Sequence, residues 1–363
     1  MTVTIDCRWI DSSGVGVYIR ESLPFILDSR HSFLLMGNPE KLKALVSGRG
    51  NTRVLDCFVP PFSLRELFFF PRNLLEKINS CDLYYSPYFN IPCLIKIPVY
   101  TTIHDMVFPD MPELCSRPGL AVRMWFYRRA FNRSRKIFTV SEFSKSRINH
   151  YSRNRVPVIV THSAIQRSIL EKRKTVTAKK NIILFIGNIK KHKGLKILIE
   201  AFLQARREGL DHKLVIVGSG EKFRTSDAGF FQGPIPIEGK SDEGGFGKGL
   251  VEFTGFISEE KLLELLGGAS LLVQPSLYEG FGLPPLEAMV LGTRALISDI
   301  PVFREIYSDF PVVYFRAGDA DDLKNKMMEI LIDKKNPFPV LPDGLLHKYT
   351  FEKTAGTIMG DLQ

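Results

Sequence analysis

The chain has 363 residues, of which 44% are hydrophobic and 24% are charged, and its formal net charge is +10. This composition excludes a largely disordered chain, and the length predicts two domains of ordinary size. No stretch of about 18 apolar residues occurs, so we expect no membrane span.

The start of the chain lacks the basic segment and apolar core of a signal peptide, so we expect a cytoplasmic protein. The five cysteines include no C-x-x-C pair, which favours reduced and mostly buried thiols.

The first half of the chain alternates strand-like and helix-like segments. The strand-like runs are short and rich in β-branched or aromatic residues, and they lie at 3–7, 33–37, 53–58, 83–86, 99–103 and 137–140. Between the first two, Val15, Tyr18, Ile19 and Ile26 follow a helical spacing. This alternation predicts a parallel sheet covered by helices.

Residues 1–170 contain 23 Lys and Arg against 13 Asp and Glu, which accounts for the whole net charge. The densest basic segment interleaves aromatic residues with cations, and its members are Arg117, Arg123, Trp125, Phe126, Tyr127, Arg128, Arg129, Arg133, Arg135 and Lys136. Such a segment favours peripheral contact with anionic lipid, which the run Phe68–Phe70 could join. The alternative is a solvated helix with one apolar core face.

The second half repeats the alternation, with strand-like runs at 182–186, 214–217, 251–253, 271–273, 295–298 and 312–315. We therefore predict an α/β protein with two doubly wound Rossmann-like domains, residues 1–170 and 171–345, followed by a terminal helix in 346–363. Residues 227–249 contain seven glycines and two prolines and show neither the helical nor the strand spacing of apolar residues. This predicts a mobile loop or an insertion.

Residues 279–287 read EGFGLPPLE and place two carboxylates eight positions apart across a glycine loop that opens a helix. Glycines allow backbone N–H groups to approach a ligand closely, and the prolines suit a helix start. A nucleotide sugar fits this pattern, since its phosphates suit a helix N-terminus and its hydroxyls suit the two acids. The alternative is an ordinary capped helix.

Residues 279–287 resemble the E-x7-E signature of the retaining family-four, or group 1, glycosyltransferases, which have the two-domain GT-B fold. Residues 187–194 (GNIKKHKG) resemble the phosphate loop of that family; Lys193 matches its Lys, whereas Asn188 replaces its usual Arg. Further similar stretches are 14–18, 85–90, 102–105 and 139–144, so the likeness covers most of the chain. The sequence of the phosphate loop is similar to that of a bacterial polysaccharide mannosyl- and rhamnosyltransferase subgroup.

The resemblance implies a retaining hexosyltransferase that moves a hexose from a nucleoside-diphosphate sugar to a lipid-linked or cell-surface polysaccharide such as lipopolysaccharide. Mannose is the hexose that the resemblance favours. GDP-mannose is favoured as the donor, and neither a metal nor another cofactor is expected. The implied catalytic residues are Glu279 at the donor sugar, Lys193 at the diphosphate and His104 beside the reacting sugar. The implied substrate-binding residues are Gly14, Gly16, Asn188, Phe256, Ile257, Gly280, Phe281, Gly282, Leu283 and Glu287.

The GT-B resemblance also implies that the terminal helix crosses back to the first domain. Phe256 is implied beside the nucleobase, although a core position is its alternative. His192 is interpreted as a solvated side chain, and Asp319 and Asp321 as capping acids rather than metal ligands.

Other functions share parts of this pattern. A nucleoside-diphosphate-sugar epimerase would share the fold and phosphate chemistry, and a catalytically inactive nucleotide-sugar-binding scaffold would bind the donor without turnover. A dinucleotide oxidoreductase would need G-x-G-x-x-G after the first strand, which Gly14 and Gly16 do not complete. A nucleic-acid partner is not expected, because it would leave the paired acids without a role.

Overall fold

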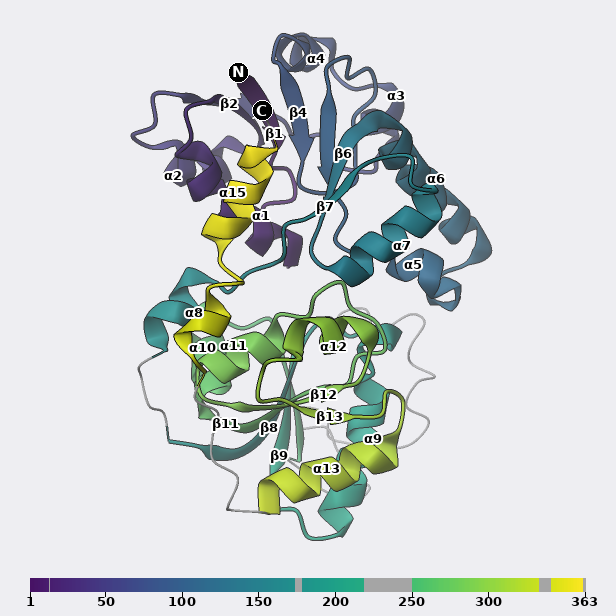
Figure 1. Ribbon diagram of the computed structural model, residues 1–363, viewed down its shortest axis with the longest axis vertical. Coiled ribbons are helices and arrows are strands. Elements are labelled where there is room, and N and C mark those ends of the chain that lie inside the picture. Colours follow the sequence, from purple (N-terminus) through teal and green to yellow (C-terminus); the bar gives the residue numbers. More distant parts are fainter. Residues whose placement is uncertain (13, 174–177, 219–249, 333–340, 362–363) are drawn as a thin grey trace. The chain divides into compact units, whose positions relative to one another are not determined.

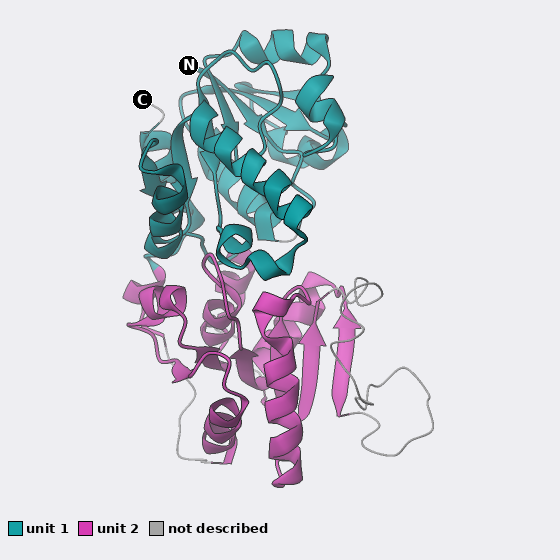
Figure 2. Cartoon of the chain, turned by 90° about the vertical axis from the view of Figure 1, so that its right-hand side faces the viewer, with its two compact units in different colours: residues 1–166, 347–363 teal, residues 167–346 magenta. Residues whose placement is uncertain are grey.

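The computed structural model describes residues 1–363 except 13, 174–177, 219–249, 333–340 and 362–363. The glycine-rich segment 227–249 lies outside the described residues. The chain forms two compact units, residues 1–166 with 347–363 and residues 167–346 (Figure 2). Each unit is an α/β unit built on one parallel sheet (Figure 1).

The first unit contains a seven-stranded parallel sheet in the order β3-β2-β1-β4-β5-β6-β7. Its strands are β1 (Thr2–Asp6), β2 (Ser32–Gly37), β3 (Thr52–Asp56), β4 (Leu83–Ser86), β5 (Val99–Thr102), β6 (Ser134–Thr139) and β7 (Val158–Val160). Its helices are α1 (Gly14–Leu27), α2 (Pro39–Val46), α3 (Leu64–Phe68), α4 (Arg72–Asn79), α5 (Val107–Asp110), α6 (Arg117–Arg133), α7 (Glu142–Ser152) and α15 (Phe351–Gly360). The sequence prediction missed only β7 among these strands.

The second unit contains a six-stranded parallel sheet in the order β10-β9-β8-β11-β12-β13. Its strands are β8 (Lys180–Ile186), β9 (Lys213–Val217), β10 (Val251–Gly255), β11 (Ala269–Gln274), β12 (Arg294–Ser298) and β13 (Val313–Phe315). Its helices are α8 (Arg167–Lys172), α9 (Leu195–Arg207), α10 (Glu259–Gly268), α11 (Pro284–Val290), α12 (Pro301–Tyr307), α13 (Ala320–Ile332) and α14 (Asp343–Leu346).

In both sheets the strand order reverses beside the first strand of the unit, between β1 and β4 and between β8 and β11. This is the doubly wound arrangement, and it confirms the predicted pair of Rossmann-like domains. In such sheets the loops after the two strands at the reversal lie side by side at their carboxyl ends. The topology therefore brings the loops after β8 and β11 together.

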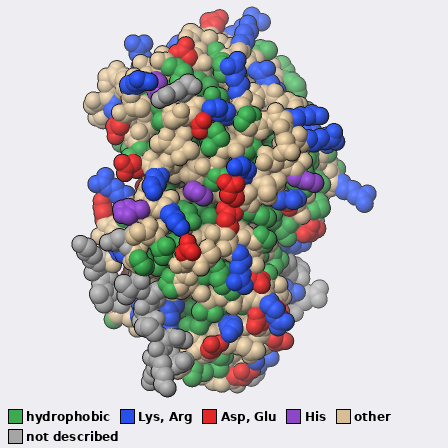
Figure 3. Space-filling view, in the orientation of Figure 1, with side chains coloured by type: hydrophobic (Ala, Val, Ile, Leu, Met, Phe, Trp, Pro, Cys, Tyr) green, Lys and Arg blue, Asp and Glu red, His purple; other side chains and the backbone are tan. Residues whose placement is uncertain are grey.

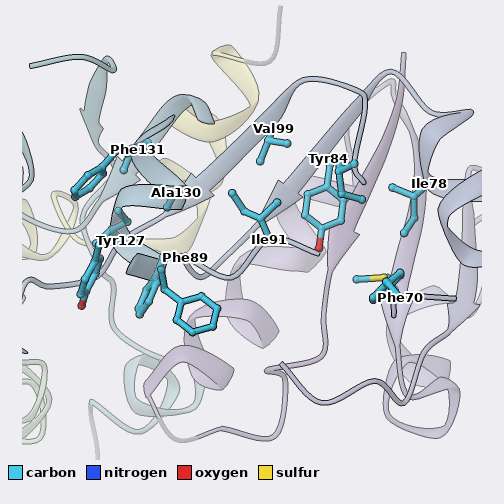
Figure 4. Packing of buried hydrophobic residues seen from close by; sticks show 14 of the residues in the cluster. Phe70, Ile78, Tyr84, Phe89, Ile91, Val99, Tyr127, Ala130 and Phe131 are labelled. Carbon is cyan, nitrogen blue, oxygen red and sulfur yellow. The ribbon is translucent and has the colours of Figure 1, made fainter. Parts of the chain in front are cut away.

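Interlocked aromatic and aliphatic side chains form the core of the first unit (Figure 4). Phe89 and Tyr127 stack with ring centroids 4.4 Å apart, and Ile91 and Val99 are almost completely buried nearby. Each buried aromatic side chain removes a large apolar area from water, so this cluster fixes the helix α6 on the sheet.

The helix α15 packs against α1 within the first unit. The ring of Phe351 lies 6.3 Å from that of Tyr18, and the Thr354 hydroxyl donates to the Thr161 carbonyl over 3.2 Å. The end of the described chain is therefore part of the same unit as its beginning, as the ribbon in Figure 1 shows.

A buried ion network lies under the carboxyl end of β1. The Arg8 guanidinium donates to the Asp6 carboxylate over 2.6 and 2.9 Å and to Glu66, and both acids are fully buried. Tyr84 and Asn90 donate further hydrogen bonds to Asp6, over 2.8 and 3.1 Å. Burial raises the pKa of Asp6, but Arg8 and the Tyr84 hydroxyl more than offset this, so the pKa lies below its usual value.

Candidate functional site

The loops after β8 and β11 bring Lys193 and Glu279 together. Lys193 ends a single 3-10 turn, Lys191–Lys193, that follows β8, and Glu279 follows β11. The Lys193 ammonium lies 2.7 Å from each oxygen of the Glu279 carboxylate. Two of the three ammonium N–H groups are thus used, which leaves the third for a ligand oxygen.

The Glu279 carboxylate is almost buried, with 8% of the residue exposed. Its Oε1 also accepts from the Ser276 hydroxyl over 2.8 Å and weakly from the Gln274 amide over 3.4 Å. Burial acts to raise the pKa of Glu279, but Lys193 and the Ser276 hydrogen bond offset it and hold the pKa below its ordinary value. The group is therefore an ionised acceptor that is well suited to a sugar hydroxyl.

His192 is buried between the loop after β8 and the loop after β11 and links them. Its carbonyl accepts from the Leu277 N–H over 2.7 Å, so the Lys193 turn is fastened to the segment before Glu279. The side chain is only 8% exposed, and the interpretation of His192 as a solvated residue is wrong. Burial and the neighbouring Lys193 lower its pKa to about 4, so the ring is neutral and adds no charge to the pair.

Glycine is required at Gly194, directly after Lys193. Its φ is +68°, and a Cβ there would lie 1.9 Å from the Pro275 carbonyl oxygen. The close approach of two backbones is what lets the Lys193 turn reach the β11 loop.

We expect Gly194→Ala to lower the midpoint of thermal unfolding by much more than Gly209→Ala. Gly209 has a φ of +97° but open space around its Cβ position, so its substitution adds backbone strain of about 1 kcal/mol without a clash. Differential scanning calorimetry of both variants measures the difference, and equal losses would contradict the clash at Gly194.

The segment 280–287 forms the predicted glycine turn and helix start. The φ of Gly282 is +85°, and the Tyr307 hydroxyl donates to its carbonyl and accepts from the Leu286 N–H. Prolines open α11, and Glu287 lies in its first turn with 5% of its surface exposed. Phe281 is buried, whereas Gly280 and Leu283 are partly exposed.

Phe256 and Ile257 follow β10, at the same edge of the second sheet as Lys193. Phe256 is 77% exposed, so the alternative of a core position is wrong and its ring face is accessible. Asn188 follows β8 and is partly exposed. Every predicted site residue of the second unit therefore lies in a loop or helix start at the carboxyl edge of its sheet.

The remaining predicted site residues, Gly14, Gly16 and His104, belong to the first unit. Gly16 lies in α1 where a Cβ would come within 2.5 Å of the Ile10 carbonyl oxygen, whereas Gly14 is exposed with open space around it. His104 follows β5, and its Nε2 lies 3.0 Å from the Pro87 carbonyl oxygen. Burial lowers the pKa of His104, so the imidazole is neutral at pH 7.

Among the described residues, no group of three or more His, Cys, Asp or Glu side chains is placed to hold a metal ion. Asp319 accepts from the Asp322 N–H over 2.9 Å at the start of α13, as predicted for a capping acid.

The five cysteines are unpaired thiols, and Cys7, Cys57 and Cys81 are buried. In the part of the chain that the structure covers, no helix is long and apolar enough to cross a bilayer.

Two family models match the chain. Residues 13–167 match the model described as Glycosyltransferase Family 4, and residues 180–333 match Glycosyl transferases group 1. The two matches fall in the two compact units.

Curated relatives with modest identity include two named mannosyltransferases. The chain is 26% identical to O-antigen chain mannosyltransferase B of Escherichia coli, over 69% of this chain and 65% of that protein. It is 27% identical to O-antigen chain mannosyltransferase RfbU of Salmonella typhimurium, over 65% of this chain and 61% of that protein. The matched region thus spans less than two thirds of either relative.

Solved structures share the fold at low identity. HepE of Anabaena, in complex with UDP and glucose, superposes with a TM-score of 0.66 at 15% identity, covering 100% of this chain and 99% of that one. The lipopolysaccharide outer core galactosyltransferase WaaB superposes with a TM-score of 0.62 at 15% identity, covering 100% of both chains.

Proposed function

Because the chain belongs to the group 1, or family 4, glycosyltransferases, we propose that it transfers mannose with retention from GDP-mannose to a lipid-linked or cell-surface polysaccharide. The observation that carries the proposal is the contact between Lys193 and Glu279 at the carboxyl edge of the second sheet. The named activities of the two O-antigen relatives support mannose as the sugar.

The chemistry of the pair suits a leaving diphosphate. Negative charge develops on the diphosphate oxygens as the bond from the sugar to the phosphate breaks, and a preorganised ammonium stabilises that charge. Lys193 is held in place by Glu279, whose own carboxylate retains lone pairs for the donor sugar hydroxyls. Glu287 in the first turn of α11 would hold the ribose, and the exposed ring of Phe256 would stack on the base.

The first test is a thermal-shift screen against GDP, UDP, dTDP and their sugars without added metal. A ligand that binds only the folded protein raises its unfolding temperature according to its concentration relative to Kd. We expect GDP-mannose and GDP to give the largest shifts. A larger shift with a UDP or dTDP sugar would replace GDP-mannose as the donor, and binding without turnover on any acceptor would indicate an inactive scaffold.

We further propose that the protein is cytoplasmic and contacts anionic membrane through a surface that we call the α3–α6 surface. It consists of exposed apolar side chains with neighbouring cations, namely Leu64, Phe68, Phe69, Leu94 and Trp125 with Arg65, Arg72 and Arg128. Figure 3 shows Lys and Arg side chains gathered where Figure 1 places α6. Phe68 and Phe69 are 63% and 75% exposed, whereas Phe70 is buried and cannot join them.

Hydrogen bonds connect the two helices of this surface. Arg129 of α6 donates to the Pro92 carbonyl over 3.0 Å, and the Cys93 N–H donates to the carbonyl of Glu66 in α3 over 3.0 Å. The loop that contains Pro92 and Cys93 therefore links α6 to α3. Arg129 therefore has a structural partner, and Arg128 is the better cation to test against lipid.

Phe68→Ser combined with Phe69→Ser is expected to weaken binding to vesicles that contain anionic lipid. The matched control is Phe25→Ser, because Phe25 is also exposed, at 41%, but lies on α1. Arg128→Gln should reduce the salt-dependent part of the binding by about 1 kcal/mol. Vesicle sedimentation measures both effects, and equal binding by all variants would show that this surface is an ordinary solvated face.

A further inference from the structure

We propose that Trp9, Phe62 and Tyr88 form a binding surface for the terminal sugar ring of the acceptor, which we call the aromatic platform. The inference rests on the proposed function and specifies its acceptor side. The three residues follow β1, β3 and β4, so the parallel sheet brings their rings to its carboxyl edge. The Trp9 and Tyr88 ring centroids are 5.0 Å apart, and Phe62 lies 5.7 Å from each.

The platform differs from the core aromatics beneath it. Trp9, Phe62 and Tyr88 are partly exposed residues, whereas Phe89, which lies next to Phe62 and Tyr88, is buried. Partly exposed aromatic rings provide apolar contact area with little loss of side-chain entropy, and the C–H face of a pyranose ring suits such a surface. A sugar also needs polar groups at the rim for its hydroxyls.

His104, Asp105 and the Tyr88 hydroxyl supply this rim. The ring of His104 lies 6.1 Å from that of Tyr88. Since the Pro87 carbonyl can only accept, His104 Nε2 carries the hydrogen, and the neutral ring offers Nδ1 as an acceptor for a sugar hydroxyl. The Asp105 carboxylate uses Oδ1 to accept from the Val107 N–H over 3.0 Å, which leaves its other oxygen for a second hydroxyl.

The buried ion network holds two of the three rings in place. Trp9 Nε1 donates to the Asn90 side-chain oxygen over 2.8 Å, and Asn90 in turn donates to Asp6 and Glu66 over 3.1 and 3.0 Å. Glu66 also accepts from the Phe62 N–H over 2.6 Å, where the backbone φ of Phe62 is +59°. Two buried carboxylates around one guanidinium are costly to desolvate, and a role in positioning the rings accounts for them.

Two tryptophans make the proposal directly testable, because Trp9 lies in the platform and Trp125 lies on α6. In the Trp125→Phe variant, Trp9 is the sole tryptophan. We expect its emission to change saturably when methyl α-D-mannopyranoside or α-mannobiose is added. The matched control is Trp9→Phe, in which Trp125 remains and should not respond to either sugar.

A steady-state assay gives a second readout. Trp9→Leu is expected to raise KM for the acceptor about tenfold while KM for the donor stays unchanged, since the ring contacts only the acceptor. Asn90→Ala, which removes the positioning bond to Trp9, should raise the same KM by a smaller factor.

Three outcomes would overturn the platform. They are a Trp9 emission that no sugar alters, a response to alkyl detergent but not to methyl mannoside, and a donor KM that rises with the acceptor KM. Thermal shifts with GDP-mannose on the Trp125→Phe variant show whether the aromatic platform alone is wrong or the proposed function is wrong as well. A retained shift leaves the donor assignment standing, whereas loss of both responses would overturn the two proposals together.

Discussion

Lys193→Ala is expected to lower kcat for sugar transfer by about 10²- to 10³-fold, which is the effect of removing one preorganised group that stabilises developing charge. The substitution has a second consequence, because it leaves the Glu279 carboxylate buried without its cation. Glu279→Gln, which keeps the shape of the side chain, should also reduce kcat strongly. Near-normal turnover in both variants would contradict the assignment of this pair.

The pH dependence distinguishes charge stabilisation from a general loss of structure. The pKa of Glu279 lies below its ordinary value of 4.5, so its ionised form stabilises the fold above that pH and the contribution is lost as the pH falls through the folded pKa. Without Lys193, only the Ser276 hydrogen bond and weaker contributions oppose desolvation, so the pKa of Glu279 should rise. The acid side of the pH–rate profile should then move to higher pH in Lys193→Ala, but not in Glu279→Gln. An unshifted profile would show that the two groups are not coupled.

The second large effect is expected in the buried ion network. Arg8→Met should lower the free energy of unfolding by about 3–5 kcal/mol, because it leaves the Asp6 and Glu66 carboxylates buried without a cation. The matched control is Arg49→Met, which removes the exposed ion pair with Asp28 and should cost less than about 1 kcal/mol.

Urea unfolding monitored by circular dichroism measures both free energies. The loss in Arg8→Met should shrink at low pH, because protonated acids no longer need the guanidinium. Burial raises the pKa of Asp6 once Arg8 no longer offsets it, so in Arg8→Met this recovery should begin above the ordinary carboxyl range. Similar losses in Arg8→Met and Arg49→Met would contradict a buried network that depends on Arg8.

The sequence predicted the two sheets well because their strands are buried on both faces. Runs such as residues 182–186 and 269–273 are almost wholly apolar, and the glycine and proline signals around them mark the ends. The strand β7 was missed because its three residues are only partly buried and too few to show a period. The alternation of strands and helices was enough to predict parallel pairing, although periodicity gives neither sheet order nor register.

The site was predictable only in part. Motif spacing placed Lys193 and Glu279 on adjacent loops, but their direct contact depends on the close approach of Gly194 to Pro275, which no local pattern reveals. The network around Arg8 was missed because Asp6, Glu66 and Asn90 lie far apart along the chain. A charged residue close behind a buried strand, as Arg8 is two positions after the end of β1, was the one available signal.

The first unit is completed by a segment that follows the entire second unit in the chain. Helix α15 covers α1 and contacts Tyr18, so during synthesis the second unit can fold while this apolar face of the first is still uncovered. The first unit therefore reaches its native state last, although it begins the chain. Shortened chains that stop before Phe351 should depend on chaperones and be degraded quickly, even with the donor-side loops fully formed.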